Sequence, residues 1–145
     1  MIAVADTSGI LTLFNRSDPD HHAARKAADQ CGFLVASPLA LTEVHQVATV
    51  RAGRGAADAI LRTLTERVRQ MRLVLAPTTP EILDAALTVR ARYASLDLDL
   101  VDAVNVALAA EYGTDAVLTR DRRDFRTVRP VGGRYTCFRI LPDDL

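Results

Sequence analysis

Short apolar segments alternate with longer helical segments along the whole chain. Five segments predict strands, at residues 2–5, 33–36, 73–76, 116–118 and 135–141. Short apolar runs of this kind are typical of strands buried on both faces of a sheet. Strands that alternate with helices are joined by crossover connections and therefore run parallel. The sequence predicts an α/β fold in a single domain of residues 1–145, a three-layer sandwich with a central, mainly parallel sheet.

A capping residue followed by proline opens three of the expected helices, because proline is tolerated at the first helical position. These pairs are Asp18-Pro19, Ser37-Pro38 and Thr79-Pro80. The expected helices span about residues 7–14, 18–31, 37–52, 56–70, 79–93 and 100–112. Residues 121–125 are expected to form a loop or one helical turn.

The composition is that of an ordinary globular protein, with 49% hydrophobic and 25% charged residues among 145. This is enough for one hydrophobic core without disulfides. No apolar run approaches the roughly 20 residues of a membrane helix. The apolar N-terminus contains Asp6 and lacks a basic region, so it does not resemble a signal peptide. Cys31 and Cys137 lie far apart, so they indicate neither a zinc site nor a disulfide framework. We therefore expect a cytoplasmic protein.

The formal net charge of zero conceals an uneven distribution. Residues 93–119 contain 5 acidic and no basic side chains, whereas residues 51–92 have a net charge of +4 and residues 120–145 of +3. A globally basic nucleic-acid-binding protein is therefore excluded. An acidic site flanked by arginine-rich surfaces is compatible with this pattern.

Four acidic residues occupy positions where solvated charge is not expected. Asp6 directly follows the first predicted strand and Asp121 comes shortly after the fourth, whereas Glu43 and Asp102 lie in apolar helical segments. Ligands of parallel α/β sheets bind at the carboxyl ends of the strands. Carboxylates gathered there would repel one another, and a hard divalent cation such as Mg²⁺ or Mn²⁺ relieves that repulsion. Each residue alone could be a helix cap or a surface charge, but together they predict a metal site.

The motifs around these residues resemble those of the PIN-domain ribonucleases, above all the toxin component of VapBC-type toxin–antitoxin systems. They are Asp6-Thr7-Ser8, Thr42-Glu43-Val44, Leu100-Val101-Asp102-Ala103 and Leu118-Thr119-Arg120-Asp121. The similarity extends over nearly the whole chain. It implies an endoribonuclease that uses Mg²⁺ (or Mn²⁺), bound by Asp6, Glu43, Asp102 and Asp121. The same resemblance implies neutralisation by a cognate antitoxin protein. His22 matches a histidine often found in these proteins, and we expect it to have a structural role.

Several polar neighbours are candidates for supporting roles. Asp99 could cap the helix that contains Asp102 or could share a helix face with it, and we favour Asp102 as the ligand and Asp99 as the cap or an outer group. Ser8, Asn105 and Thr119 are candidates for hydrogen bonds to the ligands, although capping or helix packing would explain them equally well. We interpret Asp124 as an ion-pair or capping residue, with a ligand role as the alternative.

The expected partners are RNA, an antitoxin and a second copy of the chain. Arg120, Arg122, Arg123 and Arg126 lie next to Asp121 and are candidates for phosphate contacts, although arginine clusters are often only solvated. The apolar faces of helices 37–52 and 56–70 offer a groove for an antitoxin helix. They also make a homodimer plausible. With the antitoxin helix in this groove, a basic antitoxin residue would enter the acidic cleft.

Three other classes of protein were weighed against the ribonuclease hypothesis. A haloacid-dehalogenase-like phosphatase needs a second Asp where this chain has Ser8, and a receiver domain needs a lysine after its fifth strand, whereas the one lysine here is Lys26. A catalytically inactive PIN-like interaction module is the remaining alternative. It would be favoured if one of the four carboxylates were missing.

Overall fold

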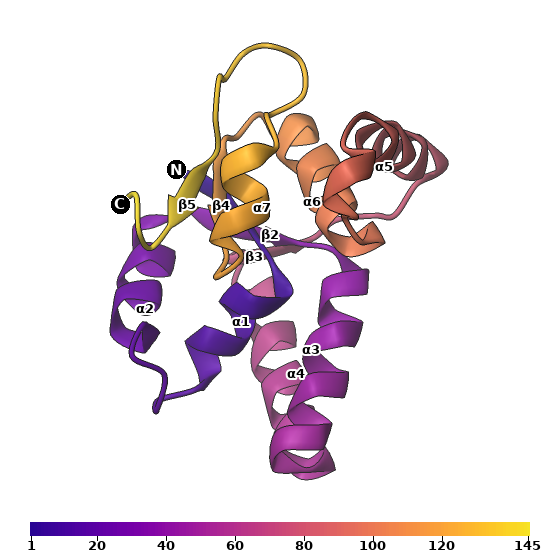
Figure 1. Ribbon diagram of the computed structural model, residues 1–145. Coiled ribbons are helices and arrows are strands. Elements are labelled where there is room, and N and C mark those ends of the chain that lie inside the picture. The colour runs from indigo at the N-terminus through magenta and orange to yellow at the C-terminus, as the bar shows by residue number, and fades with distance from the viewer.

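The central sheet is built from five parallel strands in the order β3-β2-β1-β4-β5. The computed structural model describes residues 1–145. The strands are β1 (Ile2–Ala5), β2 (Phe33–Ala36), β3 (Leu73–Leu75), β4 (Ala116–Leu118) and β5 (Arg139–Leu141). Every pairing in the sheet is parallel, which confirms the fold class expected from the sequence. The strands lie at the centre of the molecule in Figure 1.

Seven α-helices and one short 3₁₀ helix connect the strands. The α-helices are α1 (Thr7–Phe14), α2 (His21–Gln30), α3 (Pro38–Ala52), α4 (Arg54–Arg69), α5 (Pro80–Arg92), α6 (Leu100–Glu111) and α7 (Arg122–Thr127). The 3₁₀ helix, η1, spans Ala94–Leu96. Helices α3 and α4 form a long hairpin that extends away from the sheet (Figure 1). None of the helices combines the length and the apolar character that crossing a membrane requires.

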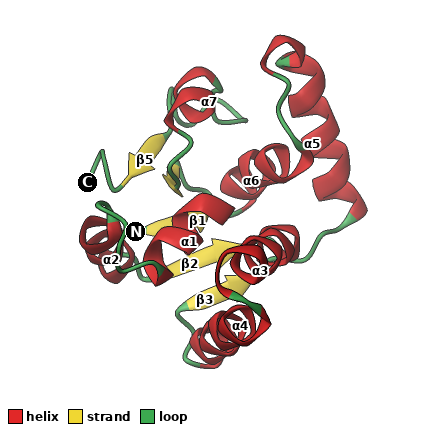
Figure 2. Ribbon diagram, turned by 60° about the horizontal axis from the view of Figure 1, so that its bottom comes forward, coloured by secondary structure: helices red, strands yellow, loops and turns green.

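Alternate residues of each strand pack into two separate cores, one on each face of the sheet. Val4 and Val35 belong to the core beneath α5 and α6, whereas Ala3 and Ala5 belong to the core beneath α1 and α2. Because side chains alternate between the faces of a strand, strands covered on both faces must be apolar throughout. Figure 2 shows the helices surrounding the strands on both sides.

Helix α1 approaches the end of β4 more closely than a side chain would permit. A Cβ atom on Gly9 would lie 2.1 Å from the carbonyl oxygen of Leu118. Gly9 is itself buried within the helix. This close approach places the first turn of α1 directly against the end of β4, where the functional residues described below are located.

Three expectations for the chain differ from the observed structure. The helix expected from Asp18-Pro19 begins at His21, because the Asp18 side chain accepts a hydrogen bond from the Asp20 backbone and forms a turn before the helix. The strand expected over residues 135–141 is limited to Arg139–Leu141. Helix α4 starts at Arg54, before the expected position.

The histidine with the structural role is His21 and not His22. His21 is 5% exposed, and its Nδ1 lies 2.9 Å from the carbonyl oxygen of Thr12, which links α2 to α1. His22 is exposed and only contacts the His21 ring edge to face, with 5.4 Å between ring centroids. The sequence alone did not distinguish two adjacent histidines, because the true start of α2 determines which of them faces α1.

We predict that Gly9→Ala strongly destabilises the protein. The added methyl group collides with backbone atoms, which cannot move as a flexible side chain would, so we expect a loss of about 1–3 kcal/mol or more in the free energy of unfolding. Chemical denaturation measures this value. Gly55→Ala is the matched control, because no atom lies within 4 Å of its Cβ position and helix propensity favours alanine by roughly 0.5–1 kcal/mol. Equal stabilities of the two variants would contradict the close approach of α1.

Candidate metal centre

The candidate site lies where the strand order reverses between β1 and β4. Strands β2 and β3 lie on one side of β1, and β4 and β5 lie on the other. The backbone N–H of Asp6 donates to the carbonyl oxygen of Leu118 at 3.0 Å, so the pairing of β1 with β4 continues to the edge of the sheet. Crevices at such switch points are the usual ligand sites of parallel sheets. Asp6 and Thr119, the residues that follow these two strands, therefore lie side by side.

The Asp6 carboxylate is buried and held by hydrogen bonds on both oxygens. It is 5% exposed. Its Oδ1 accepts from Nδ2 of Asn105 at 3.0 Å, and its Oδ2 accepts from Oγ1 of Thr119 at 2.9 Å. Ser8 lies 3.5 Å from the same Oδ2 and 3.1 Å from Oγ1 of Thr119. Asp6 is thus fixed in one orientation by neutral donors.

Asp102 enters the site from the first turn of α6. The Asp99 side chain caps this helix by accepting from the Asp102 backbone N–H at 2.8 Å. This is the capping arrangement favoured from the sequence, and it leaves the Asp102 side chain free to face the sheet edge. Asn105 lies almost one helical turn later, which places both side chains on the same side of α6.

Asp121 and Asp124 repeat this arrangement at the start of α7. The Asp121 side chain accepts from the Asp124 backbone N–H at 3.2 Å. Carboxylate oxygens of Asp102, Asp121 and Asp124 lie within 4.8 Å of one another. Asp124 thus has the capping contact expected from the sequence, and its carboxylate also lies in the cluster. Asp121 and Asp124 have the same Asp-x-x-Asp spacing as Asp99 and Asp102. This repeated spacing is the sequence signal that could have indicated that Asp124 lies in the cluster.

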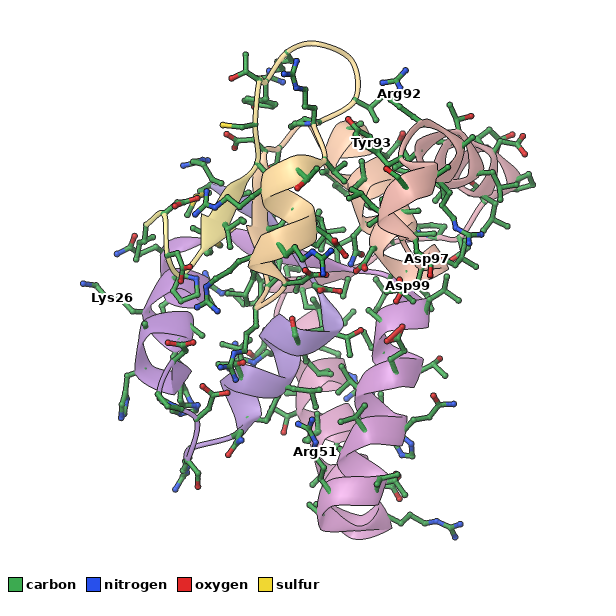
Figure 3. All side chains as sticks on the ribbon, in the orientation of Figure 1. Lys26, Arg51, Arg92, Tyr93, Asp97 and Asp99 are labelled. Carbon is green, nitrogen blue, oxygen red and sulfur yellow. The ribbon has the colours of Figure 1, made fainter.

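Glu43 borders the cluster from α3 without joining it. The Thr7 hydroxyl donates to its Oε2 over 3.5 Å. Figure 3 shows Asp99 beside the N-terminal end of α3, and the charge of Asp99 acts, after burial, to raise the pKa of Glu43. Four separate elements therefore contribute carboxylates: the end of β1, α3, the start of α6 and the start of α7.

None of these acidic side chains forms an ion pair. Other acidic residues do form ion pairs. Near the site, Asp18 and Asp20 pair with Arg120, Asp20 and Asp143 with Arg122, and Asp144 with Arg126; at the opposite end of the sheet, Asp115 pairs with Arg139. The protein thus has nearby arginines, but they neutralise other carboxylates. The negative charge at the sheet edge remains without a basic partner.

Burial and the neighbouring negative charges raise the pKa values of Asp6, Glu43, Asp102 and Asp124. Burial, followed by the charges of Asp6 and Asp99, raises the pKa of Asp102 to about 8. Burial is also the first cause of the raised pKa of Asp6, with the Thr119 hydrogen bond acting in the opposite direction. The pKa values of Glu43 and Asp124 are raised by burial and by neighbouring carboxylates. Folding therefore brings together groups that resist being charged together.

The donor set suits a hard divalent cation. All the clustered atoms are carboxylate oxygens, which Mg²⁺ and Mn²⁺ prefer to nitrogen or sulfur ligands. The Asn105 side-chain oxygen is buried and has no hydrogen-bond partner in the protein, which is a rare condition in folded proteins. A cavity of about 680 Å³ lies between α5 and α6, away from the metal centre, because none of the site carboxylates lines it.

Comparison with known proteins agrees with this geometry. The PIN domain model matches residues 3–129, which include all the residues of the site. The chain belongs to the PIN-domain family. It is 34% identical over 135 residues to Ribonuclease VapC26 of Mycobacterium tuberculosis, an alignment that covers 92% of this chain and 97% of the relative.

Solved structures of related toxins show the same PIN fold. VapC20 of Mycobacterium tuberculosis, described as a sarcin-ricin loop cleaving toxin, matches with a TM-score of 0.70 and 22% identity over 83% of this chain and 90% of its own. VapBC2 of Rickettsia felis, bound to a DNA fragment from its promoter, matches with a TM-score of 0.68 and 11% identity over 97% and 98%. A toxin–antitoxin complex from Klebsiella pneumoniae matches with a TM-score of 0.64 and 22% identity over 92% and 98%.

The arginines beside the PIN-domain site differ in their availability. Arg120, Arg122 and Arg126 are engaged with aspartates, whereas Arg123 is exposed and forms no ion pair. The sequence grouped all four arginines as candidate phosphate contacts. It could not reveal the pairing, because the partner aspartates lie about 20 or about 100 residues away along the chain.

We predict that Asp102→Asn changes how the stability of this PIN domain depends on pH. In the folded protein burial and neighbouring carboxylates raise the pKa of Asp102 from its ordinary value of 3.8 to about 8. The folded state therefore binds the proton more tightly than the unfolded chain does, so stability decreases as the pH rises from about 4 to about 8. Without divalent cations, the variant should unfold at a higher temperature than the wild type at pH 8. The difference should become small near pH 4.

Thermal unfolding followed by circular dichroism in a chelating buffer measures this effect. Asp97→Asn is a suitable control, because Asp97 is exposed and lies a few residues before Asp102 in the chain. If the unfolding temperatures of the wild type and Asp102→Asn changed with pH in parallel, the pKa of Asp102 would not be raised in the folded protein.

Proposed function

We propose that this protein is a metal-dependent endoribonuclease that acts as a toxin and is neutralised by a cognate antitoxin. The observation that carries the proposal is the cluster of unpaired carboxylates at the sheet edge, in a chain 34% identical to a ribonuclease. The fixed position of Asp6 and the unpaired charge of Asp102, Asp121 and Asp124 support Mg²⁺ or Mn²⁺ as the cofactor. We also propose that the protein acts in the cytoplasm, where this substrate is found.

The acidic residues of the site have different proposed roles. Asp6, Asp102, Asp121 and Asp124 would hold the ion, with Glu43 completing the acidic surface around it. A bound divalent ion lowers the pKa of water and neutralises charge that develops on a phosphate. Thr119 and Ser8 orient Asp6, and the Thr119 hydroxyl also accepts from the Asp121 backbone N–H at 2.9 Å. Thr119 therefore ties the end of β1 to the start of α7.

The acidic surface requires a cation before RNA can approach, because phosphates and carboxylates repel each other. Single-stranded RNA is bound through its backbone charge and through exposed bases that stack on side chains. Among the four arginines near Asp121, Arg123 forms no ion pair, and it lies next to Asp124 in the sequence. We assign the phosphate contact on this side of the site to Arg123.

A groove next to the site supports the antitoxin proposal. It has a volume of about 460 Å³ and lies between α1 and the α3–α4 hairpin. Leu11, Phe14 and Ile60 contribute apolar walls, and Ser8 and Arg120 connect the groove to the metal centre. An apolar antitoxin segment in this groove would bring a basic side chain within reach of the carboxylates. The homodimer expected from the sequence remains a prediction.

The first prediction of this proposal is cleavage of RNA by the purified protein in Mg²⁺ or Mn²⁺ and its loss in EDTA. Asp6→Asn keeps the shape of the side chain but removes its charge. Substitutions of groups that only support metal ligands typically reduce activity about 10–100-fold, so loss of the Asp6 charge should exceed about 100-fold. Gel analysis of labelled RNA measures the rate. Because both preparations share the same purification, equal cleavage by wild type and Asp6→Asn would indicate a contaminating nuclease.

The second prediction separates Arg123 from its neighbours. Arg123→Ala should weaken RNA binding and reduce the slope of log affinity against log salt by about 0.7, the value for one contact to a single strand. Arg126→Ala removes the same charge but takes it from an arginine already paired with Asp144. Its slope should remain that of the wild type. Binding is measured by fluorescence anisotropy in the Asp6→Asn background, and identical slopes for both variants would refute the assignment.

A further inference from the structure

We propose that Asn105 is a positioning residue that holds Asp6 in place for the cation through the hydrogen bond from its Nδ2 to Oδ1 of Asp6. This inference rests on the proposed function, because it concerns the same metal centre. It assigns no contact between Asn105 and RNA. Asn105 would act through Asp6, and its effect would be measurable in the absence of any substrate.

Asn105 is an exception within its helix. The seven consecutive residues Ala103–Ala109 of α6 are all buried, and Asn105 is the one polar side chain among them. It is 0% exposed. Burial of an amide is unfavourable unless its groups form hydrogen bonds, so packing alone would favour an apolar residue here, as at Val104 and Val106.

The orientation of the Asn105 amide follows from its partner. An ionised carboxylate only accepts hydrogen bonds, so the contact of 3.0 Å with Oδ1 of Asp6 must be made by Nδ2. The amide oxygen is then directed elsewhere, and it has no donor in the protein. A buried acceptor without a partner is unusual.

The Asp6 carboxylate would lose its fixed position without this amide. Thr119 and Ser8 both lie at Oδ2, whereas Asn105 is the side chain that holds Oδ1. A carboxylate fixed at both oxygens loses less freedom when a cation binds than one fixed at a single oxygen. The expected consequence of removing the amide is weaker cation binding, with little change in the fold.

Asn105→Leu and Asn105→Ala test this role together. Leucine retains most of the side-chain volume and alanine does not, but neither can donate to Asp6. Both variants should therefore bind Mn²⁺ about 10–100-fold more weakly than the wild type, the usual effect of losing a group that orients a metal ligand. The electron paramagnetic resonance signal of free Mn²⁺ measures binding without RNA, and circular dichroism monitors folding.

Thr114→Val is the matched control. Thr114 is also a buried polar residue, and its hydroxyl donates to the carbonyl oxygen of Ile2 at 2.6 Å, at the opposite end of the sheet. The control loses a buried hydrogen bond, so its stability should decrease while its Mn²⁺ affinity remains that of the wild type. A general effect of destabilisation on ion binding would appear in this variant as well.

A double-mutant cycle tests whether Asn105 acts through Asp6. In the Asp6→Asn background, Asn105→Ala should reduce Mn²⁺ affinity further by less than about threefold, because groups in contact are not additive. A full 10-fold loss in that background would show that the amide acts independently of Asp6.

The outcomes distinguish this inference from the proposed function. Wild-type protein that neither binds Mn²⁺ nor cleaves RNA would overturn the proposed function. Wild-type binding with unchanged affinity in Asn105→Ala would overturn the role of Asn105 alone. Weakened binding in Asn105→Ala that Asn105→Leu restores would show that Asn105 only fills space, which also overturns it. If Asn105→Leu does not fold, the alanine variant and its cycle with Asp6→Asn decide the question.

Discussion

Mutual repulsion among carboxylates at the end of the sheet is the constraint around which this structure is organised. The acidic side chains of β1, α3, α6 and α7 converge where the strand order reverses, and none forms an ion pair. Folding therefore requires the chain to gather charges that would separate if they were free. Burial, together with this repulsion, raises the pKa values of Asp6, Glu43, Asp102 and Asp124. The proposed divalent cation would relieve this repulsion.

The scaffold supplies the rigidity that such a site needs. The apolar strands are packed on both faces, so the edge positions of Asp6 and Thr119 are determined by the hydrogen-bonded pairing of β1 with β4. Gly9 allows α1 to lie against the end of β4, and the two aspartate caps determine where α6 and α7 begin. Arginines neutralise the surrounding aspartates, which concentrates the uncompensated charge at the site.

The sequence predicts the elements of this fold because buried strands and capped helices leave strong local patterns. It predicts that Asp6 and Asp121 lie at the same end of the sheet because both follow strands, and the capping role of Asp99 follows from its spacing to Asp102. Contacts between distant segments leave no such pattern. The pairing of Arg120 with Asp18 and the choice of His21 over His22 depend on the turn before α2. The carboxylate of Asp124 joins the cluster because α7 begins at the sheet edge.

The most direct test of this account is a crystal structure of the protein soaked in Mn²⁺, with anomalous diffraction data collected near the manganese absorption edge. The account predicts an anomalous peak bordered by the carboxylates of Asp102, Asp121 and Asp124, with Asp6 facing it. The peak should disappear in Asp102→Asn crystals treated in the same way. A peak located away from these side chains, or none at a Mn²⁺ concentration that supports RNA cleavage, would contradict the account.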